Sequence, residues 1–371
     1  MAKIARIEIL LVPLLPKTKR IDAIQSFVCQ ETVLLRIHDV DGAVGTGYAY
    51  TIGTGGSSII RLLSDHLTPR LIGREADEIE RIWTDLKFHT HATTVGPITA
   101  LALAAIDTAL WDLRACRVNL PLWKLAGGAK DRAPLYTTEG GWLHLDPQAL
   151  IDDALEAKRL GFGGAKIKIG KPSAHEDVAR LEKLRTRLGD DFEILTDCNQ
   201  AFTVDEAIRR AHMLEQLGLG WIEEPLPADD LDGHIRLNRA TSIPVAVGES
   251  IYSLRHFREY MQKGACSIVQ VDAARIGGIT PWLKVAHVAE AFNMPVCPHF
   301  LMELHVSLTC AVPNGRWVEY IPQLDEITTS RLTIENGHAV APSTPGLGIE
   351  WDWDEIDKRK VEALDILTGA S

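Results

Sequence analysis

The sequence lacks the closely spaced cysteines of a disulfide framework. Its six cysteines are scattered along 371 residues, and no two of them form a CxxC motif. This distribution is typical of reduced thiols in a reducing compartment. We therefore expect a cytoplasmic protein.

A hydrophobic run long enough to span a bilayer is also missing. The apolar N-terminal stretch MAKIARIEILLVPLL is punctuated by Pro13 and Pro16, and no small-residue cleavage pattern follows it. We expect this stretch to form a β-strand rather than a signal peptide.

The chain has no excess of positive charge. Its 39 Lys and Arg residues against 50 Asp and Glu residues leave a net charge of −11, which disfavours nucleic acid or an anionic membrane as a partner. A small anionic substrate remains compatible, because a bound cation and local lysines can reverse the field inside a cleft. The glycine-rich segment IGTGGSS at 52–58 is not followed by Lys-Ser/Thr, which disfavours a phosphate-binding loop.

The alternation of apolar runs and amphipathic stretches predicts an α/β barrel. Between about residues 133 and 320, eight short strand-like runs alternate with helical segments, the rhythm of a (β/α)₈ barrel. Residues 1–50 look β-rich, and residues 57–127 look helical, with Asp107 in an apolar helix where we expect it to be hydrogen-bonded. The tail from about 325 contains a hairpin around Asn336 and Gly337. We expect this tail to pack on the N-terminal β region.

Three acidic residues recur at a constant stride at the ends of apolar runs. Asp197, Glu223 and Glu249 end EILTD, GWIE and PVAVGE, and each stride is 26 residues (223 − 197 and 249 − 223). One strand plus one crossover helix has about this length, so the three carboxylates should converge at the strand ends of a parallel barrel. Converging carboxylates repel one another unless a hard divalent cation neutralises them. The pattern predicts one Mg²⁺ site.

Two lysines are expected beside this metal site. Lys166 and Lys168 lie two apart in AKIKIG, which places both side chains on one face of a strand. Burial and mutual repulsion would lower the pKa of an ammonium group, so that one lysine could act as a base. The alternative is a pair of lysines reaching solvent from a strand edge.

Three further strand ends carry polar residues that are candidates for the active site. Asp272 ends SIVQVD and His299 ends MPVCPH on consecutive barrel units, so that Asp272 could orient His299 and raise its basicity. Glu319 in RWVEY could hydrogen-bond a substrate oxygen if it is protonated. Asn199 could donate to a substrate hydroxyl or to a metal-bound oxygen.

The polar segment 16–30 carries Lys17, Lys19 and Arg20. It is either a solvated loop or a lid over the site. As a lid, its cationic side chains would suit a polyhydroxylated acid.

These residues suit proton abstraction next to a carboxylate. The enediolate that results carries concentrated negative charge, which a metal and cationic or acidic donors stabilise. A lysine on one face and a His–Asp dyad on the other allow racemisation, by re-protonation of the opposite face, or dehydration, by loss of a β-hydroxyl.

The chain resembles the enolase superfamily, mandelate racemase subgroup. The resemblance is carried by AIDTALWDL, AKIKIG, LTDCN, WIEEP, VGES, QVDAARIGGIT, PHF and WVEY. It implies a modified (β/α)₇β barrel at 129–324, with an α+β capping domain built from 1–128 and 325–371. It also implies Mg²⁺ on the three carboxylates, acid/base roles for Lys168 and for the pair of His299 with Asp272, and contact between Glu319 and the substrate carboxylate. The stretches YTTEGGWLH and PHFLMELHVSL look most like galactarate and talarate dehydratases.

The sequence therefore predicts a Mg²⁺-dependent dehydratase of an aldarate or aldonate that yields a 2-keto-3-deoxy acid. A racemase or epimerase using the same residues is the first alternative, and a non-catalytic barrel is the second. Members with large caps often assemble, so we expect a homo-oligomer.

Overall fold

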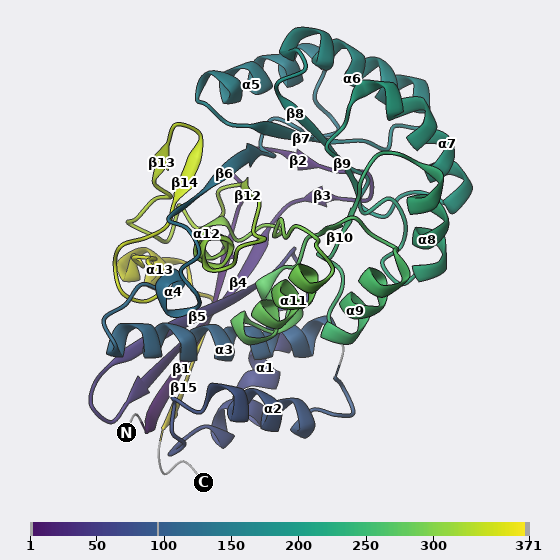
Figure 1. Ribbon diagram of the computed structural model, residues 1–371. Helices are drawn as coiled ribbons and strands as arrows, with labels where there is room; N and C mark the ends of the chain where they lie inside the picture. Colours follow the sequence, from purple (N-terminus) through teal and green to yellow (C-terminus); the bar gives the residue numbers. More distant parts are fainter. Residues whose placement is uncertain (1–2, 95, 368–371) are drawn as a thin grey trace.

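The computed structural model describes residues 3–94 and 96–367, which form a capping sheet with helices and a parallel barrel (Figure 1). The cap contains four antiparallel strands in the order β15-β1-β4-β5. Their bounds are Ile4–Leu14 (β1), Gln30–Asp39 (β4), Val44–Thr51 (β5) and Glu362–Leu367 (β15). The apolar N-terminal stretch thus forms the expected strand, β1.

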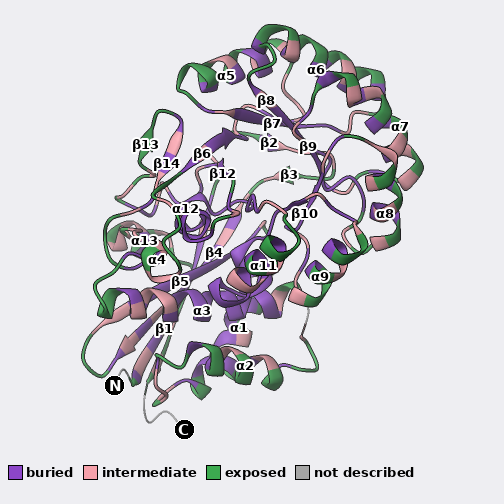
Figure 2. Cartoon of the chain, in the orientation of Figure 1, coloured by how far each residue is buried: buried purple, intermediate pink, exposed green. Residues whose placement is uncertain are grey.

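Four helices follow the first three strands of the cap. They are α1 (Gly56–Leu62), α2 (Ile79–His89), α3 (Pro97–Arg117) and the short α4 (Leu122–Leu125). Two of them, α1 and α3, contact the sheet. The Ala/Leu-rich α3 is buried along most of its length between the sheet and the barrel, as its apolar composition predicts (Figure 2).

The barrel is built from parallel strands joined by helices. The strands are β6 (Arg132–Thr137), β7 (Gly164–Lys168), β8 (Glu193–Asp197), β9 (Trp221–Glu223), β10 (Val245–Val247), β11 (Ile268–Val269) and β12 (Val318–Tyr320). Val296 forms parallel bridges with Val269 and with Gly315, and so occupies the position between β11 and β12. Because β12 also pairs with β6, the barrel closes.

Helices follow each barrel position except the last. They are α5 (Pro147–Arg159), α6 (Ala174–Leu188), α7 (Val204–Leu214), α8 (Leu231–Ala240), α9 (Leu254–Lys263), α10 (Ala273–Ile276), α11 (Ile279–Ala291) and α12 (Met302–Ala311). No barrel helix follows β12 in the described chain, which corresponds to the expected (β/α)₇β arrangement.

The C-terminal segment divides its contacts between the two parts. The predicted hairpin is present as β13 (Ile334–Glu335) and β14 (His338–Val340), with positive φ at Asn336 and Gly337. However, β14 pairs with β6 of the barrel and not with the N-terminal region, where we expected the tail to pack. The segments after the hairpin do reach the cap, because α13 (Trp353–Arg359) contacts β1 and β15 pairs with β1. Within this segment, α13 and β15 contact the cap strand β1, whereas the hairpin packs on the barrel.

The segment 16–30 folds over the barrel mouth. It contains a two-stranded ribbon, β2 (Arg20–Ile21) and β3 (Ser26–Phe27), which is seen among the barrel strands in the view of Figure 1. The Leu143 amide donates to the Ile21 carbonyl at 2.9 Å. Ala23 packs against Gly170. A Cβ added to Gly170 would come within 2.7 Å of the Ala23 Cβ, and its φ of +128° also favours glycine. We call residues 16–30 the lid.

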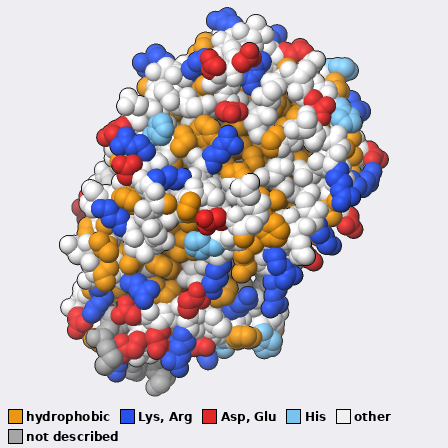
Figure 3. Space-filling view, in the orientation of Figure 1, with side chains coloured by type: hydrophobic (Ala, Val, Ile, Leu, Met, Phe, Trp, Pro, Cys, Tyr) orange, Lys and Arg blue, Asp and Glu red, His pale blue; other side chains and the backbone are white. Residues whose placement is uncertain are grey.

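No helix in the described residues is long and apolar enough to cross a membrane. On the face seen in Figure 3, side chains of both charge signs are interspersed around hydrophobic ones.

Candidate active site

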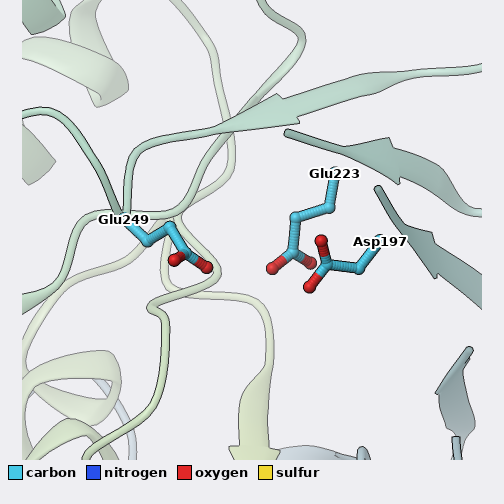
Figure 4. Close-up of side chains that lie close together, drawn as sticks. All are labelled: Asp197, Glu223 and Glu249. Atoms are coloured by element: carbon cyan, nitrogen blue, oxygen red, sulfur yellow. The ribbon is translucent and has the colours of Figure 1, made fainter. Parts of the chain in front are cut away.

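Three carboxylates converge at the carboxyl ends of the barrel strands. Asp197 is the last residue of β8 and Glu223 the last of β9, and the two are register partners. Glu249 follows β10. All three are buried, and one oxygen from each lies within 4.8 Å of the others (Figure 4). The sequence spacing predicted this convergence.

The donor set fits a hard divalent cation. Burial raises the pKa of Glu223 to about 7, and repulsion from Asp197, Glu319 and Glu249 adds to it although Lys166 opposes it. A doubly charged ion among the three carboxylates would relieve that repulsion. Carboxylate oxygens are the ligands that Mg²⁺ prefers, so Asp197, Glu223 and Glu249 could hold it.

Both lysines of β7 face the barrel interior, as their spacing predicts. Lys166 is 1% exposed, and its Nζ lies 2.8 Å from Glu223 Oε1 and 2.7 Å from Glu319 Oε1. Lys168 lines the pocket, and its Nζ donates to Asp197 Oδ2 and, at 3.1 Å, to Asn199 Oδ1. The alternative of solvent-exposed lysines is wrong.

The ionisation of these lysines differs from the expectation based on burial and repulsion. Burial lowers the pKa of Lys168, but the nearby carboxylates of Asp197, Glu223 and Glu249 together outweigh this, so that the pKa is raised. The pKa of Lys166 is raised further, because Glu223 and Glu319 outweigh the cost of burial. Both shifts favour the ammonium form of these lysines.

The expected dyad is formed. His299 Nδ1 donates to Asp272 Oδ2 at 2.9 Å, and His299 Nε2 lies 3.1 Å from Glu249 Oε2. Burial would lower the pKa of His299, but Glu249 and Asp272 raise it. Burial would likewise raise the pKa of Asp272, yet the hydrogen bond from His299 helps to hold it at about 2.

Glu319 is an acceptor in this structure. Its oxygens accept from Thr138 Oγ1 at 2.6 Å, from the Phe300 amide at 2.7 Å and from Lys166. Burial raises the pKa of Glu319, but Lys166 and His299 hold it far below the ordinary range. The protonated form considered from the sequence is therefore disfavoured here.

Backbone strain is concentrated just after the barrel strands. Positive φ angles occur at Asn199 (45°), Gln200 (63°), Glu224 (38°) and Phe300 (61°), all of which line the pocket. Non-glycine residues in this region cost energy and persist where the surroundings hold them, commonly at functional sites. The sequence contained no direct signal for this strain.

The lid contributes residues other than the three cations predicted from the sequence. Lys17 and Lys19 are exposed and do not line the pocket between the carboxylates and the lid. Arg20 is buried but points away from that pocket, donating to Gln323 Oε1 at 3.0 Å and pairing with Glu139. The lid residues that do line the pocket are Asp22, Ile24, Gln25 and Phe27.

Two further polar residues were not singled out from the sequence. Arg275 lines the pocket and donates to Glu249 Oε1 at 3.2 Å. Tyr50, at the end of the cap strand β5, donates to Asp272 Oδ2 at 2.7 Å. Arg275 lies within the recognised QVDAARIGG motif, but only the fold brings Tyr50 to the dyad.

Comparison with known proteins identifies the family. Residues 7–127 match the mandelate racemase / muconate lactonizing enzyme N-terminal domain, and residues 149–355 match the enolase C-terminal domain-like family. The chain is 35% identical to L-talarate/galactarate dehydratase of Salmonella typhimurium, over 85% of this chain and 79% of that protein. It is 36% identical to 3,6-anhydro-alpha-L-galactonate cycloisomerase of Streptomyces coelicolor, over 89% of this chain and 92% of that protein.

A solved structure extends the similarity to the whole fold. The crystal structure of the Salmonella dehydratase with Mg and L-lyxarohydroxamate superposes with a TM-score of 0.94 at 31% identity, covering 99% of this chain and 95% of that one. The chain therefore belongs to the mandelate racemase / muconate lactonizing enzyme family of the enolase superfamily.

Proposed function

We propose that this protein is a Mg²⁺-dependent dehydratase of an acid sugar, a carbon–oxygen lyase. The observation that carries the proposal is the placement of Lys168 and of His299, with its partner Asp272, around one pocket beside the three converging carboxylates. Lys168 extends from β7 and His299 from the barrel position between β11 and β12, so that an acid bound between them meets a nitrogen base on each side.

The chain's own groups can carry both proton transfers. Lys168 Nζ, once deprotonated, removes the proton from the carbon next to the carboxylate, and the C–H electron pair enters the carboxylate to form an enediolate. The β C–O bond then breaks as His299 Nε2 donates its proton to the departing oxygen, which leaves as water. The enol product ketonises to a 2-keto-3-deoxy acid.

For a substrate with the opposite configuration at C2, His299 is the base that removes the C2 proton. Glu319 and Lys166, which lie 2.7 Å apart and line the same pocket, would contact the reacting carboxylate. Bound Mg²⁺ would supply Lewis-acid stabilisation of the charge that develops on this carboxylate.

Relatives support the reaction class. The Salmonella relative is a dehydratase of L-talarate and galactarate, and its structure contains Mg. The Streptomyces relative is a cycloisomerase of 3,6-anhydro-α-L-galactonate. The oxygen of that anhydro ring is β to the carboxylate, so its elimination opens the ring and releases no water. Because this relative has similar identity and higher coverage, ring-opening elimination is the second candidate function.

The deciding experiment is a carbonyl-forming assay on a panel of aldonates, aldarates and 3,6-anhydroaldonates with Mg²⁺, combined with C2 deuterium exchange in D₂O. Dehydration gives a 2-keto-3-deoxy acid and water, whereas exchange without elimination supports a racemase or epimerase. If no acid of the panel gives product or exchanges its C2 proton, the proposal is contradicted.

Variants of the two bases separate the steps. For a substrate whose C2 proton faces Lys168, Lys168→Met should lower the rates of both exchange and elimination at least about a thousandfold. His299→Asn should stop elimination of the β-hydroxyl while exchange at C2 continues. Loss of exchange in His299→Asn alone would reverse the assigned roles.

We also propose that the enzyme acts in the cytoplasm on a small anionic sugar acid and assembles as a homo-oligomer. All six cysteines are unpaired in the structure, which suits a reducing compartment.

A further inference from the structure

We propose that the pocket selects acids with a single carboxylate, namely aldonates and their cyclic ethers, over dicarboxylic aldarates. This inference rests on the proposed function and names its substrate class. Sequence identity does not distinguish the two substrate classes, because the 35% identical relative acts on the diacids talarate and galactarate and the 36% identical one on a monoacid. The residues of the lid distinguish them.

The residues that line the pocket come from two chemically different parts of the chain, the barrel and the lid with the cap. At the barrel end lie Lys166, Lys168 and His299, beside the three carboxylates. The lid contributes Asp22, Ile24, Gln25 and Phe27 to the lining, and the cap contributes Ile52. The reacting carboxylate has to sit at the barrel end, where the bases are, so that the tail of the acid extends toward the lid.

Every cation that lines the pocket in the described chain already faces a carboxylate at the barrel end. Lys166 contacts Glu223 and Glu319, Lys168 contacts Asp197, and His299 contacts Asp272 and Glu249. Arg275 is held by Glu249 at 3.2 Å, and its guanidinium lies over the Tyr50 ring.

The cations of the lid are directed elsewhere. The Arg20 guanidinium is 4% exposed and is occupied by Glu139, by Gln323 Oε1 and by the Pro322 carbonyl. Lys17 is 64% exposed beside Asp325, and Lys19 is exposed as well. A carboxylate at the far end of a substrate would thus meet none of the three.

What the far end of a substrate would meet instead is Asp22. Asp22 is half-buried and lines the pocket, and its Oδ1 accepts the amides of Ile24 and Gln25 at 2.8 Å each, which orients the carboxylate. A hydroxymethyl end can donate a hydrogen bond to this carboxylate, whereas a second carboxylate would face a like charge without a cation. An acid with a single carboxylate fits both ends.

The test compares acids that differ only at C6. Galactonate with galactarate, gluconate with glucarate and mannonate with mannarate share their C2–C5 configuration within each pair. We expect kcat/KM for the reactive aldonate to exceed that of its aldarate at least tenfold, which corresponds to about 1.4 kcal/mol. Calorimetric binding of each pair to the Mg²⁺-loaded protein should show the same preference. An aldarate that reacts or binds as well as its aldonate overturns the inference.

Two lid variants test the physical reason. Asp22→Asn removes the charge but keeps an Oδ1 acceptor for the Ile24 and Gln25 amides, so the lid retains its fold. The aldarate-to-aldonate ratio of kcat/KM should rise about tenfold in this variant and further in Asp22→Asn combined with Gln25→Lys, which adds a cation. Asp325→Asn, which removes a charge outside the pocket, is the matched control and should leave the ratio unchanged. An unchanged ratio in Asp22→Asn overturns the inference.

Failure of the proposed function gives a different result. If no acid reacts or exchanges its C2 proton, the enzyme class is wrong, while preferential binding of the aldonates would still support selection by the lid. Equal binding within all three pairs, with or without turnover, contradicts the selection alone.

Discussion

Tyr50 donates a hydrogen bond to Asp272 across the boundary between the cap and the barrel. The Oη–Oδ2 distance is 2.7 Å, and the same oxygen accepts from His299 Nδ1 at 2.9 Å. The other oxygen of Asp272 accepts the amides of Ala274 and Arg275. A side chain of the cap sheet therefore helps to hold the dyad of the barrel in place.

Tyr50→Phe tests this positioning role. Loss of a hydrogen bond to a buried carboxylate costs about 1.5–3 kcal/mol, so we expect kcat to fall about tenfold or more while KM changes little. Because Asp272 would become a stronger acceptor, the pH at which His299 loses its proton should rise in the kcat profile. Steady-state kinetics across pH measure both effects.

Tyr48→Phe is the matched control. Tyr48 lies on the same strand and is 1% exposed, and its hydroxyl has no hydrogen-bond partner within the described residues. The variant should retain the wild-type kcat and pH profile. Equal losses in both variants would mean that Tyr50 acts only through the packing of the cap.

Arg20 holds the lid in place, and its removal should weaken substrate binding. Its guanidinium joins the lid to Glu139, Gln323 and the Pro322 carbonyl. We expect Arg20→Met to raise KM about tenfold with a smaller change in kcat, and to speed proteolytic cleavage within 16–30, because ordering the lid then costs binding energy. Lys17→Met and Lys19→Met should stay within about twofold of wild type, since both side chains are exposed. A larger effect of either lysine variant would indicate direct contact with substrate.

Glu223→Gln tests the proposed metal ligands. Replacing one of three converging carboxylates should weaken Mg²⁺ binding at least tenfold in calorimetry and abolish turnover, and EDTA should inactivate the wild type reversibly. Glu303→Gln is the control, because Glu303 has a pKa raised to about 7 by burial but lies outside the pocket. Wild-type Mg²⁺ affinity in Glu223→Gln would exclude Glu223 as a ligand.

Asp107 makes stability depend on pH. Its carboxylate accepts the Thr280 amide at 2.8 Å where barrel helix α11 begins, and burial raises its pKa from the ordinary 3.8 to about 7. The folded state then holds this proton more tightly than the unfolded state. This tighter binding of the proton adds up to about 4 kcal/mol to the free energy of unfolding. The gain is complete below about pH 3.8 and is lost as the pH rises through about 7.

Asp107→Asn removes this titration. Urea unfolding should show the variant gaining stability relative to wild type between pH 4.5 and pH 8, because only the wild type has to bury a charge at the higher pH. A difference that is independent of pH would show that Asp107 is ionised throughout this range.

Local periodicity made most of the site predictable. The stride of 26 residues (223 − 197 and 249 − 223) brings three carboxylates to successive strand ends, and a period of two places Lys166 and Lys168 on one face. His299 and Asp272 follow from the same logic, because they end consecutive units of a barrel. In each case the separation along the chain, combined with regular geometry, determines the position in space.

Contacts between distant segments determined the rest. Whether Arg20 or Asp22 faces the substrate depends on Glu139 and Gln323, which lie more than a hundred residues away and hold the guanidinium. The pKa of Lys168 depends on the balance between burial and the charges of Asp197, Glu223 and Glu249. The hairpin strand β14 pairs with the first half of β6, beside the segment of β6 that pairs with β12, and not with the cap. The sequence by itself determined the barrel and the residues at its strand ends, because regular secondary structure repeats. Only the tertiary structure decided lid orientation, charge state and the reach of Tyr50, because these depend on long-range packing and electrostatics.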